Sequence, residues 1–264
     1  MKSKKHIETK QEQDKEESID VSDSQIATQK VVTIPEDWTP KTRLGKMVAE
    51  GKITSMDQVF EKGLKVSEPE IIDALVPDLE HEIIYIGGSS GKGGGIKRTI
   101  SRRTTRMHKS GRRYRVSVMI VVGNKNGYVG FGKSSGPPSK HRDVINKALR
   151  NAKLNLMQIR RGCGSWECAC RGYHSIPFGV SGKAGSVSVE LFPAPKGIGL
   201  VVSDEAKKIF KLAGIKDVWI KSRGNTGMRI NVVRAIFDAF KKLGGFKIDD
   251  TIIENTGLKT GKVQ

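Results

Sequence analysis

Four side chains that can bind a metal ion lie within twelve residues of this chain: Cys163, Cys168, Cys170 and His174. Thiolates and a neutral imidazole are the ligands of tetrahedral structural zinc sites. The spacing differs from a standard zinc knuckle, because a single residue separates Cys168 from Cys170. Two interpretations therefore remain open, one structural zinc ion or a turn in which these residues serve as small packing groups.

Catalysis by the same residues is not expected. A nucleophilic cysteine needs a helix N-terminus or an oriented base beside it, and neither is evident here. A zinc deaminase needs a Pro-Cys-x-x-Cys motif, which the chain lacks. The acids Asp204, Glu205, Asp217 and Asp238 are scattered and form no recognisable pair for acid–base work. We therefore expect no enzymatic activity. A zinc-dependent RNA enzyme would need a general base, and the sequence offers none that is recognisable.

A glycine-rich stretch at residues 87–95 reads GGSSGKGGG and could be mistaken for a nucleotide-binding loop. A P-loop requires Ser or Thr after its Gly-Lys pair, whereas Gly93 follows Lys92. A flexible loop that carries Lys92 to a polyanion is the better interpretation.

The segment from Ile83 to Arg142 contains no Asp or Glu and carries 14 lysines and arginines. Sixty residues of one charge sign repel one another unless a polyanion neutralises them. Nucleic acid is the commonest such polyanion, and it binds Lys and Arg through release of condensed counterions. Tyr114 is the one aromatic residue between Lys97 and Arg115, so phosphate contacts are favoured over base stacking.

The whole chain of 264 residues has a net charge of +19 and a pI near 9.9. Its longest purely apolar run covers about five residues, far below the roughly 20 that span a bilayer. We expect no signal peptide and no membrane association. Three clustered cysteines are not a disulfide framework, and we expect a cytoplasmic setting.

Composition and periodicity divide the chain into six parts. Residues 1–34 are polar and predict a disordered tail, and residues 35–80 predict three short helices. The first helix is expected to start at Thr39-Pro40, the second at a capping box over Ser55–Gln58, and the third to cover Glu70–Leu75.

Residues 81–158 predict two strands and a helix. The strands are expected over Arg115–Val122 and Tyr128–Phe131, joined by a turn at Asn124–Gly127. Residues 132–138 are expected to form a loop, and Ser139 to cap a helix with an apolar stripe.

Residues 159–174 form the Cys/His linker, and residues 175–245 predict a β-β-α-β-α unit. Its strands are expected over 176–180, 186–191 and 218–221, with a turn at 181–185. One helix is expected to begin after Ser203 and a last one to end at Gly244. Residues 246–264 read as a polar tail.

Several motifs together resemble the family of universal small-subunit ribosomal protein five, in its archaeal and eukaryotic branch. The motifs are WTPKTRLG (38–45), GRR (111–113), VVGN (121–124), GYVGFG (127–132), RRGCGSWEC (160–168), HSIPF (174–178), PAPKGIG (193–199) and AGIKD (213–217). The match runs in order over roughly residues 36–243, which makes it more specific than any one motif.

The resemblance implies an α+β fold: a double-stranded-RNA-binding-like domain, then an α/β domain with a left-handed β-α-β crossover, after a helical N-terminal extension. It implies a structural role in the small ribosomal subunit, near the channel through which mRNA enters, and support of decoding accuracy. The implied partners are small-subunit ribosomal RNA and proteins four, eight, two and three. The family's RNA-facing loop falls on Asn124–Gly127.

The candidate RNA-binding residues are Lys92, Lys97, Arg98, Arg102, Arg103, Arg106, Lys109, Arg112, Arg113, Arg115, Asn124, Lys125, Asn126 and Lys183. The second domain is expected to pack mainly on protein neighbours. The alternative is a free-standing binder of double-stranded RNA with the same charge and a strong salt dependence.

Overall fold

The computed structural model describes residues 38–90, 96–168 and 170–261. The tail expected over residues 1–34 lies outside the described residues. Of the flexible loop expected over residues 87–95, residues 87–90 form a strand instead, and 91–95, with Lys92, lie outside the described residues. The helices are α2 (Arg43–Ala49), α3 (Met56–Glu61), α4 (Pro69–Leu75), η1 (Pro138–Lys140), α5 (His141–Leu154), α6 (Asp204–Ala213), α7 (Arg229–Gly244) and α8 (Asp250–Thr256). The strands are β1 (Glu80–Ile84), β2 (Gly87–Ser90), β3 (Ile96–Thr99), β4 (Arg102–His108), β5 (Gly111–Gly123), β6 (Tyr128–Gly136), β7 (Leu156–Gln158), β8 (Arg160–Arg161), β9 (Val180–Ala184), β10 (Val187–Pro193), β11 (Leu200–Val201), β12 (Val218–Arg223) and β13 (Lys259–Thr260).

The first sheet is antiparallel and is built around β5. Its order is β1-β5-β6-β7, and β4 pairs with the N-terminal half of β5. Because successive side chains of a strand point to opposite faces, the apolar run of β5 serves both faces of the sheet. Val118 and Ile120 belong to one core cluster, whereas Met119 and Val121 belong to the other.

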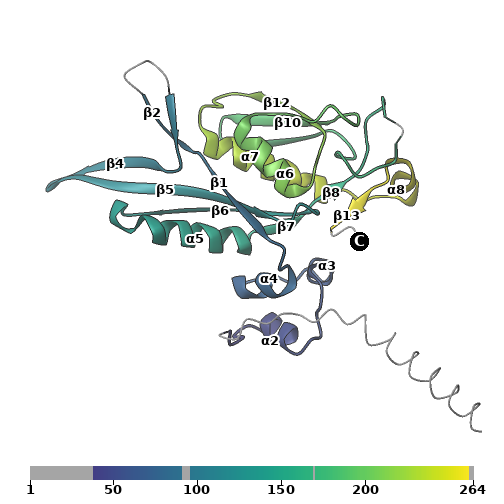
Figure 1. Cartoon of the computed structure of the whole chain (residues 1–264), viewed down its shortest axis with the longest axis horizontal. Coiled ribbons are helices and arrows are strands. Elements are labelled where there is room, and N and C mark those ends of the chain that lie inside the picture. Colours follow the sequence, from purple (N-terminus) through teal and green to yellow (C-terminus); the bar gives the residue numbers. More distant parts are fainter. Residues whose placement is uncertain (1–37, 91–95, 169, 262–264) are drawn as a thin grey trace, which may run out of the picture.

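One face of this sheet is covered by helices from two parts of the chain (Figure 1). α5 buries Val144, Ala148 and Ala152 against it. The short helices α2–α4 add Ile71 and Ile72, both fully buried, to the same cluster. The N-terminal helices therefore complete a core, since none is long enough to be stable alone.

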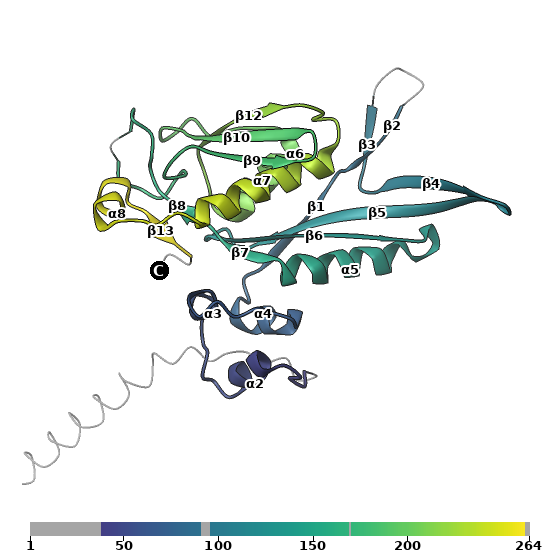
Figure 2. The same ribbon diagram turned by 180° about the vertical axis from the view of Figure 1, so that it is seen from behind.

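The opposite face packs against α6 and α7, which are covered in turn by a second sheet of order β11-β12-β10-β9 (Figure 2). The contact between the two halves includes Phe131 and Phe237, whose ring centroids are 4.5 Å apart. The β-β-α-β-α order is present, but its first strand, predicted over residues 176–180, lies instead at residues 180–184, and the short β11 is added parallel to β12. Helices therefore lie in two layers and sheets in two.

The loop predicted over residues 132–138 and the turn predicted over 181–185 are largely wrong. Residues 132–136 continue β6, and 180–184 form β9. Glycine is typical of loops and turns, but at these places it permits close packing of a helix. A Cβ on Gly132 would lie 2.0 Å from the carbonyl oxygen of Ala148, and one on Gly182 would lie 2.1 Å from that of Ala235.

Two predicted helix starts also differ from the structure, whereas α3 begins directly after Ser55 as predicted but lacks the predicted side-chain cap. Thr42, not Thr39, caps α2 and accepts a hydrogen bond from the Gly45 amide. Ser55 precedes α3 without making a side-chain cap, so the predicted capping box is absent. α5 begins at His141 after a short 3-10 turn, and Ser139 lies inside that turn.

The predicted tail after residue 246 is wrong as well. Residues 250–256 form α8, and β13 pairs with β8. Leu258 is buried, which explains why this segment folds back. Among the described residues no helix combines the length and hydrophobicity that a membrane span requires.

Candidate nucleic-acid interface and metal cluster

The basic segment before the central strand forms a projecting two-stranded ribbon. β4 pairs with β5 from Arg102↔Ser117 to His108↔Gly111, whereas β6 pairs with β5 only from Val116 onward. Residues 111–115 therefore have β4 as their partner and no third strand. We call residues 102–115 the basic arm, which extends beyond α5 in Figure 1. A two-stranded ribbon without a covering layer is marginally stable in water.

Each face of the basic arm carries arginines. Arg106 lies directly opposite Arg113, and Arg115 lies opposite Thr104 on the same face. The other face carries Arg103 and Arg112. Like charges opposite each other in a sheet are destabilising, and no described carboxylate forms a salt bridge with an arginine of the arm. The arm therefore presents a surface that an external anion would stabilise.

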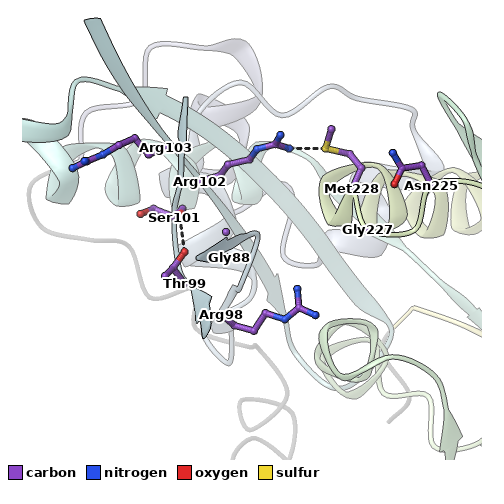
Figure 3. Close-up of a pocket in the computed structure, with 10 residues that line it drawn as sticks. Gly88, Arg98, Thr99, Ser101, Arg102, Arg103, Asn225, Gly227 and Met228 are labelled. Carbon is purple, nitrogen blue, oxygen red and sulfur yellow. Dashed lines mark hydrogen bonds between the residues drawn. The ribbon is translucent and has the colours of Figure 1, made fainter. Parts of the chain in front are cut away.

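A pocket of about 730 Å³ lies at the base of the arm (Figure 3). Arg98 of β3 and Arg102 and Arg103 of the arm line it, together with Asn225 and Met228 just before α7. The guanidinium of Arg102 contacts the Met228 sulfur. The charged surface thus continues from the arm to the β2–β3 hairpin. Lys97 and Lys109, both exposed, lie on that hairpin and at the tip of the arm.

The turn Asn124–Gly127 lies away from the arm and makes contacts within the chain. The Asn124 Oδ1 accepts hydrogen bonds from the amides of Asn126 and Tyr128. The Lys125 amide donates to the Leu212 carbonyl at the end of α6. The Lys125 side chain is exposed and pairs with Glu80. Lys183, exposed on β9, belongs to the second sheet. The candidate residues therefore do not form a single patch.

Arg161 is only 2% exposed, although its position in a basic run predicts a surface residue. Its Nη2 donates to Asn126 Oδ1 at 2.8 Å and to the Gly261 carbonyl at 3.4 Å, and its Nη1 donates to the Gly214 carbonyl at 3.4 Å. Burial lowers the pKa of the guanidinium. In sequence Arg161 resembles any other residue of a basic run, so no local signal distinguishes it.

The structure brings the four predicted metal ligands together. The ligand atoms of Cys163, Cys168, Cys170 and His174 all lie within 4.8 Å of one another. The Cys168 Sγ is 4.0 Å from the His174 Nε2. His174 and Cys163 are buried, whereas Cys170 is exposed. Three sulfurs and one imidazole nitrogen so close together match the donor set of a closed structural zinc site.

Asp217 supports this cluster from a distant part of the sequence. Its Oδ2 lies 2.8 Å from the His174 Nδ1, and its Oδ1 accepts hydrogen bonds from the amides of Gly197 and Gly199. A carboxylate at Nδ1 fixes the imidazole tautomer that leaves Nε2 free to bind a metal. Sequence reasoning treated Asp217 as one of several scattered acids, because nothing local links residues 174 and 217.

The cysteines of the cluster differ in acidity. Burial, together with neighbouring thiols, raises the pKa of Cys163 to about 11. The backbone amide of Lys196, helped by Cys170, lowers the pKa of Cys168 to about 6. Since metal ligation needs thiolates, a bound cation would have to offset the burial cost at Cys163.

Comparisons with known proteins point in one direction. The family profile described as "Ribosomal protein S5, N-terminal domain" matches residues 99–160, and "Ribosomal protein S5, C-terminal domain" matches residues 182–252. Proteins described as small ribosomal subunit protein uS5 are similar along most of their length. The relative from Methanobrevibacter smithii is 49% identical over 224 residues, covering 85% of this chain and 97% of its own. That from Nanoarchaeum equitans is 46% identical, covering 86% and 97%, and that from Staphylothermus marinus is 48% identical, covering 78% and 88%.

Proposed function

We propose that this chain, which belongs to the ribosomal protein S5 family, is a structural constituent of the small ribosomal subunit and binds its RNA through the basic arm. The family is structural and not enzymatic. The observation that carries the RNA contact is the pairing of Arg106 opposite Arg113 on an uncovered ribbon. Such a surface is destabilising in water but complementary to a phosphate backbone.

The proposed phosphate contacts are the basic residues of the arm and of the adjoining hairpin. They are Lys97, Arg98, Arg102, Arg103, Arg106, Lys109, Arg112, Arg113 and Arg115. Lys125, which is exposed and paired with Glu80, and Lys183, which is exposed on β9, are proposed contacts outside the arm. Asn124 and Asn126 have a supporting role, because their side chains hold the turn and Arg161.

Family membership also supports a location. We propose that residues 81–158 act as a double-stranded-RNA-binding-like domain and that the β11–α6–β12 connection is the left-handed crossover. The proposed neighbours are small-subunit proteins four and eight, with two and three nearby, close to the channel through which mRNA enters. The proposed setting is the cytoplasm, and the proposed consequence is support of decoding accuracy.

Sedimentation of a cell lysate from the source organism tests this assignment. A tagged chain should travel with the small subunit and resist a high-salt wash. The pair Arg112→Glu/Arg113→Glu should lower incorporation, whereas the exposed control pair Lys62→Glu/Lys65→Glu should not. If the wild-type chain stays at the top of the gradient, it is a free-standing RNA binder. If the arm variant incorporates normally, the arm is not the contact.

We also propose that Cys163, Cys168, Cys170 and His174 hold one structural zinc ion. The convergence of their ligand atoms and the Asp217 contact to His174 support this proposal. Zinc would neutralise the thiolates and fix the loop between β8 and β9. Elemental analysis of the purified full chain tests it: we expect one zinc per chain, lost in Cys163→Ser. A stoichiometry near zero after purification without chelators would exclude the site.

A further inference from the structure

A second basic pocket, of about 1010 Å³, lies at the opposite end of β5 from the basic arm and includes the turn that follows this strand. It is lined by the turn after β5, by β8 and the loop that carries the metal cluster, by the β10–β11 connection with the start of β11, and by α6 with the residues just after it. Lysines and one arginine dominate its lining. The cationic members are Lys125, Lys196, Lys207, Lys211, Lys216 and Arg161, and none of its lining residues is acidic.

Arg161 lines this pocket with a buried guanidinium. The guanidinium is buried but has no carboxylate partner among the described residues, since its acceptors are one amide and two backbone carbonyl oxygens. Its Nε has no hydrogen-bond partner among the described residues either. An ionised group removed from water is costly unless a counter-charge lies near it. The electrostatics of the pocket therefore favour an anionic occupant.

The pocket also has an aromatic and apolar side. Tyr173 is 42% exposed and lines it together with Leu200 and Ile215. The Tyr173 ring already has the Arg161 guanidinium 5.3 Å from its centroid and the Lys259 ammonium 5.1 Å from it. Cations beside an exposed aromatic ring suit a phosphorylated base better than an acidic peptide, because bases stack on aromatic and guanidinium planes.

We infer that this pocket holds an unpaired nucleotide of the small-subunit RNA, with Tyr173 against the base and Lys211 and Lys216 at the flanking phosphates. The inference rests on the proposed function and extends it, because it assigns an RNA contact to the half expected to bind proteins. Cys170 and His174 line the same pocket, so the metal cluster holds one of its walls in place.

Cross-linking in assembled small subunits gives the first test. Ultraviolet irradiation, nuclease digestion and mass spectrometry should recover a nucleotide attached to the peptide that contains Tyr173. Carbodiimide coupling, which activates carboxylates and joins them to nearby lysine amines, tests the competing outcome in the same particles. If Lys211 and Lys216 are joined to acidic residues of a neighbouring protein and no nucleotide is attached, the inference is overturned.

Binding of the purified full chain to small-subunit RNA gives the second test. Lys211→Ala/Lys216→Ala should reduce the salt dependence of binding, and the variant should lose about sevenfold less affinity than the wild type between 50 and 200 mM salt, from about 0.7 counterions released per contact. The control Lys241→Ala/Lys247→Ala removes the same charge from exposed positions outside the pocket. Equal effects of the two pairs would refute the inference.

An arm variant measured in parallel separates the two proposals. If the arm pair weakens binding and the pocket pair does not, the proposed function stands and the nucleotide pocket is wrong. If neither pair changes binding, both are wrong.

Discussion

Replacing Arg106 and Arg113 by glutamine removes two charges that face each other on the basic arm. Glutamine keeps much of the side-chain length and polarity, so the change is mainly electrostatic. Both residues are exposed. We expect the free energy of unfolding of the free chain to stay the same or rise slightly, because a like-charged cross-strand pair is lost.

RNA binding should respond in the opposite way. Each phosphate contact on a duplex contributes about 0.9 to the slope of log K against log salt concentration, so two contacts contribute about 1.8. Between 50 and 200 mM salt this difference amounts to about a twelvefold change in affinity, from the same counterion release. The variant should therefore bind more weakly at low salt but lose less affinity as salt rises.

Fluorescence anisotropy with labelled small-subunit RNA at four salt concentrations measures both the affinity and the slope. Thermal unfolding of the same samples shows whether the fold survives. The control pair Lys62→Gln/Lys65→Gln removes two exposed charges from the segment between α3 and α4, far along the chain from the arm. It should leave the slope nearly unchanged.

The reasoning is refuted if the arm pair and the control pair change the slope equally. That result would mean that total charge, and not the opposed arginines, governs binding. If the arm variant unfolded at a lower temperature than the wild type, the argument that charge repulsion destabilises this ribbon would also be wrong.

Three further predictions concern stability. Glu68→Gln should lower the free energy of unfolding by about 1 kcal/mol at pH 7. Burial raises the pKa of Glu68, but hydrogen bonds from Thr42, Trp38 and Lys41 outweigh burial and hold the pKa below its ordinary value of 4.5. That stability is present above the unfolded pKa and is lost as pH falls through the lower folded pKa, so urea unfolding curves of variant and wild type should converge in acid. Gly132→Ala should cost several kcal/mol, at the order of an overpacked core, whereas Gly244→Ala, with nothing within 4 Å, should be neutral or slightly stabilising; equal values in urea titrations would contradict the close-packing argument. Chelation of zinc should lower the Tm of the wild type, and the same treatment should leave Cys163→Ser unchanged in differential scanning calorimetry.

Patterns of short range were predicted well from the sequence. The apolar run of β5, the Asn-Gly turn and the apolar stripe of α5 each give a local signal that the structure confirms. The closely spaced cysteines and His174 likewise marked a cluster that forms in space. In each case the residues that act together are neighbours in the chain.

Features that depend on distant partners were missed. Gly132 and Gly182 looked like breakers because the helices that lie on them come later in the sequence. Arg161 and Asp217 looked ordinary because their partners are many residues away. Leu258 was assigned to a tail because nothing nearby shows that β13 returns to β8. The local sequence around one residue does not show a contact whose other partner lies far along the chain.

The 13 residues of β5 run without interruption from the tip of the basic arm into both cores. At about 3.3 Å per residue the strand is roughly 43 Å long. One end of the strand is packed between two layers, and the other end projects without a covering layer. Because no hinge separates the two ends, the direction of the arm, the proposed RNA contact, is set by the packing around Met119 and Ile120. Substitutions of these core residues would therefore change the direction of the basic arm, the proposed binding surface, without contacting it.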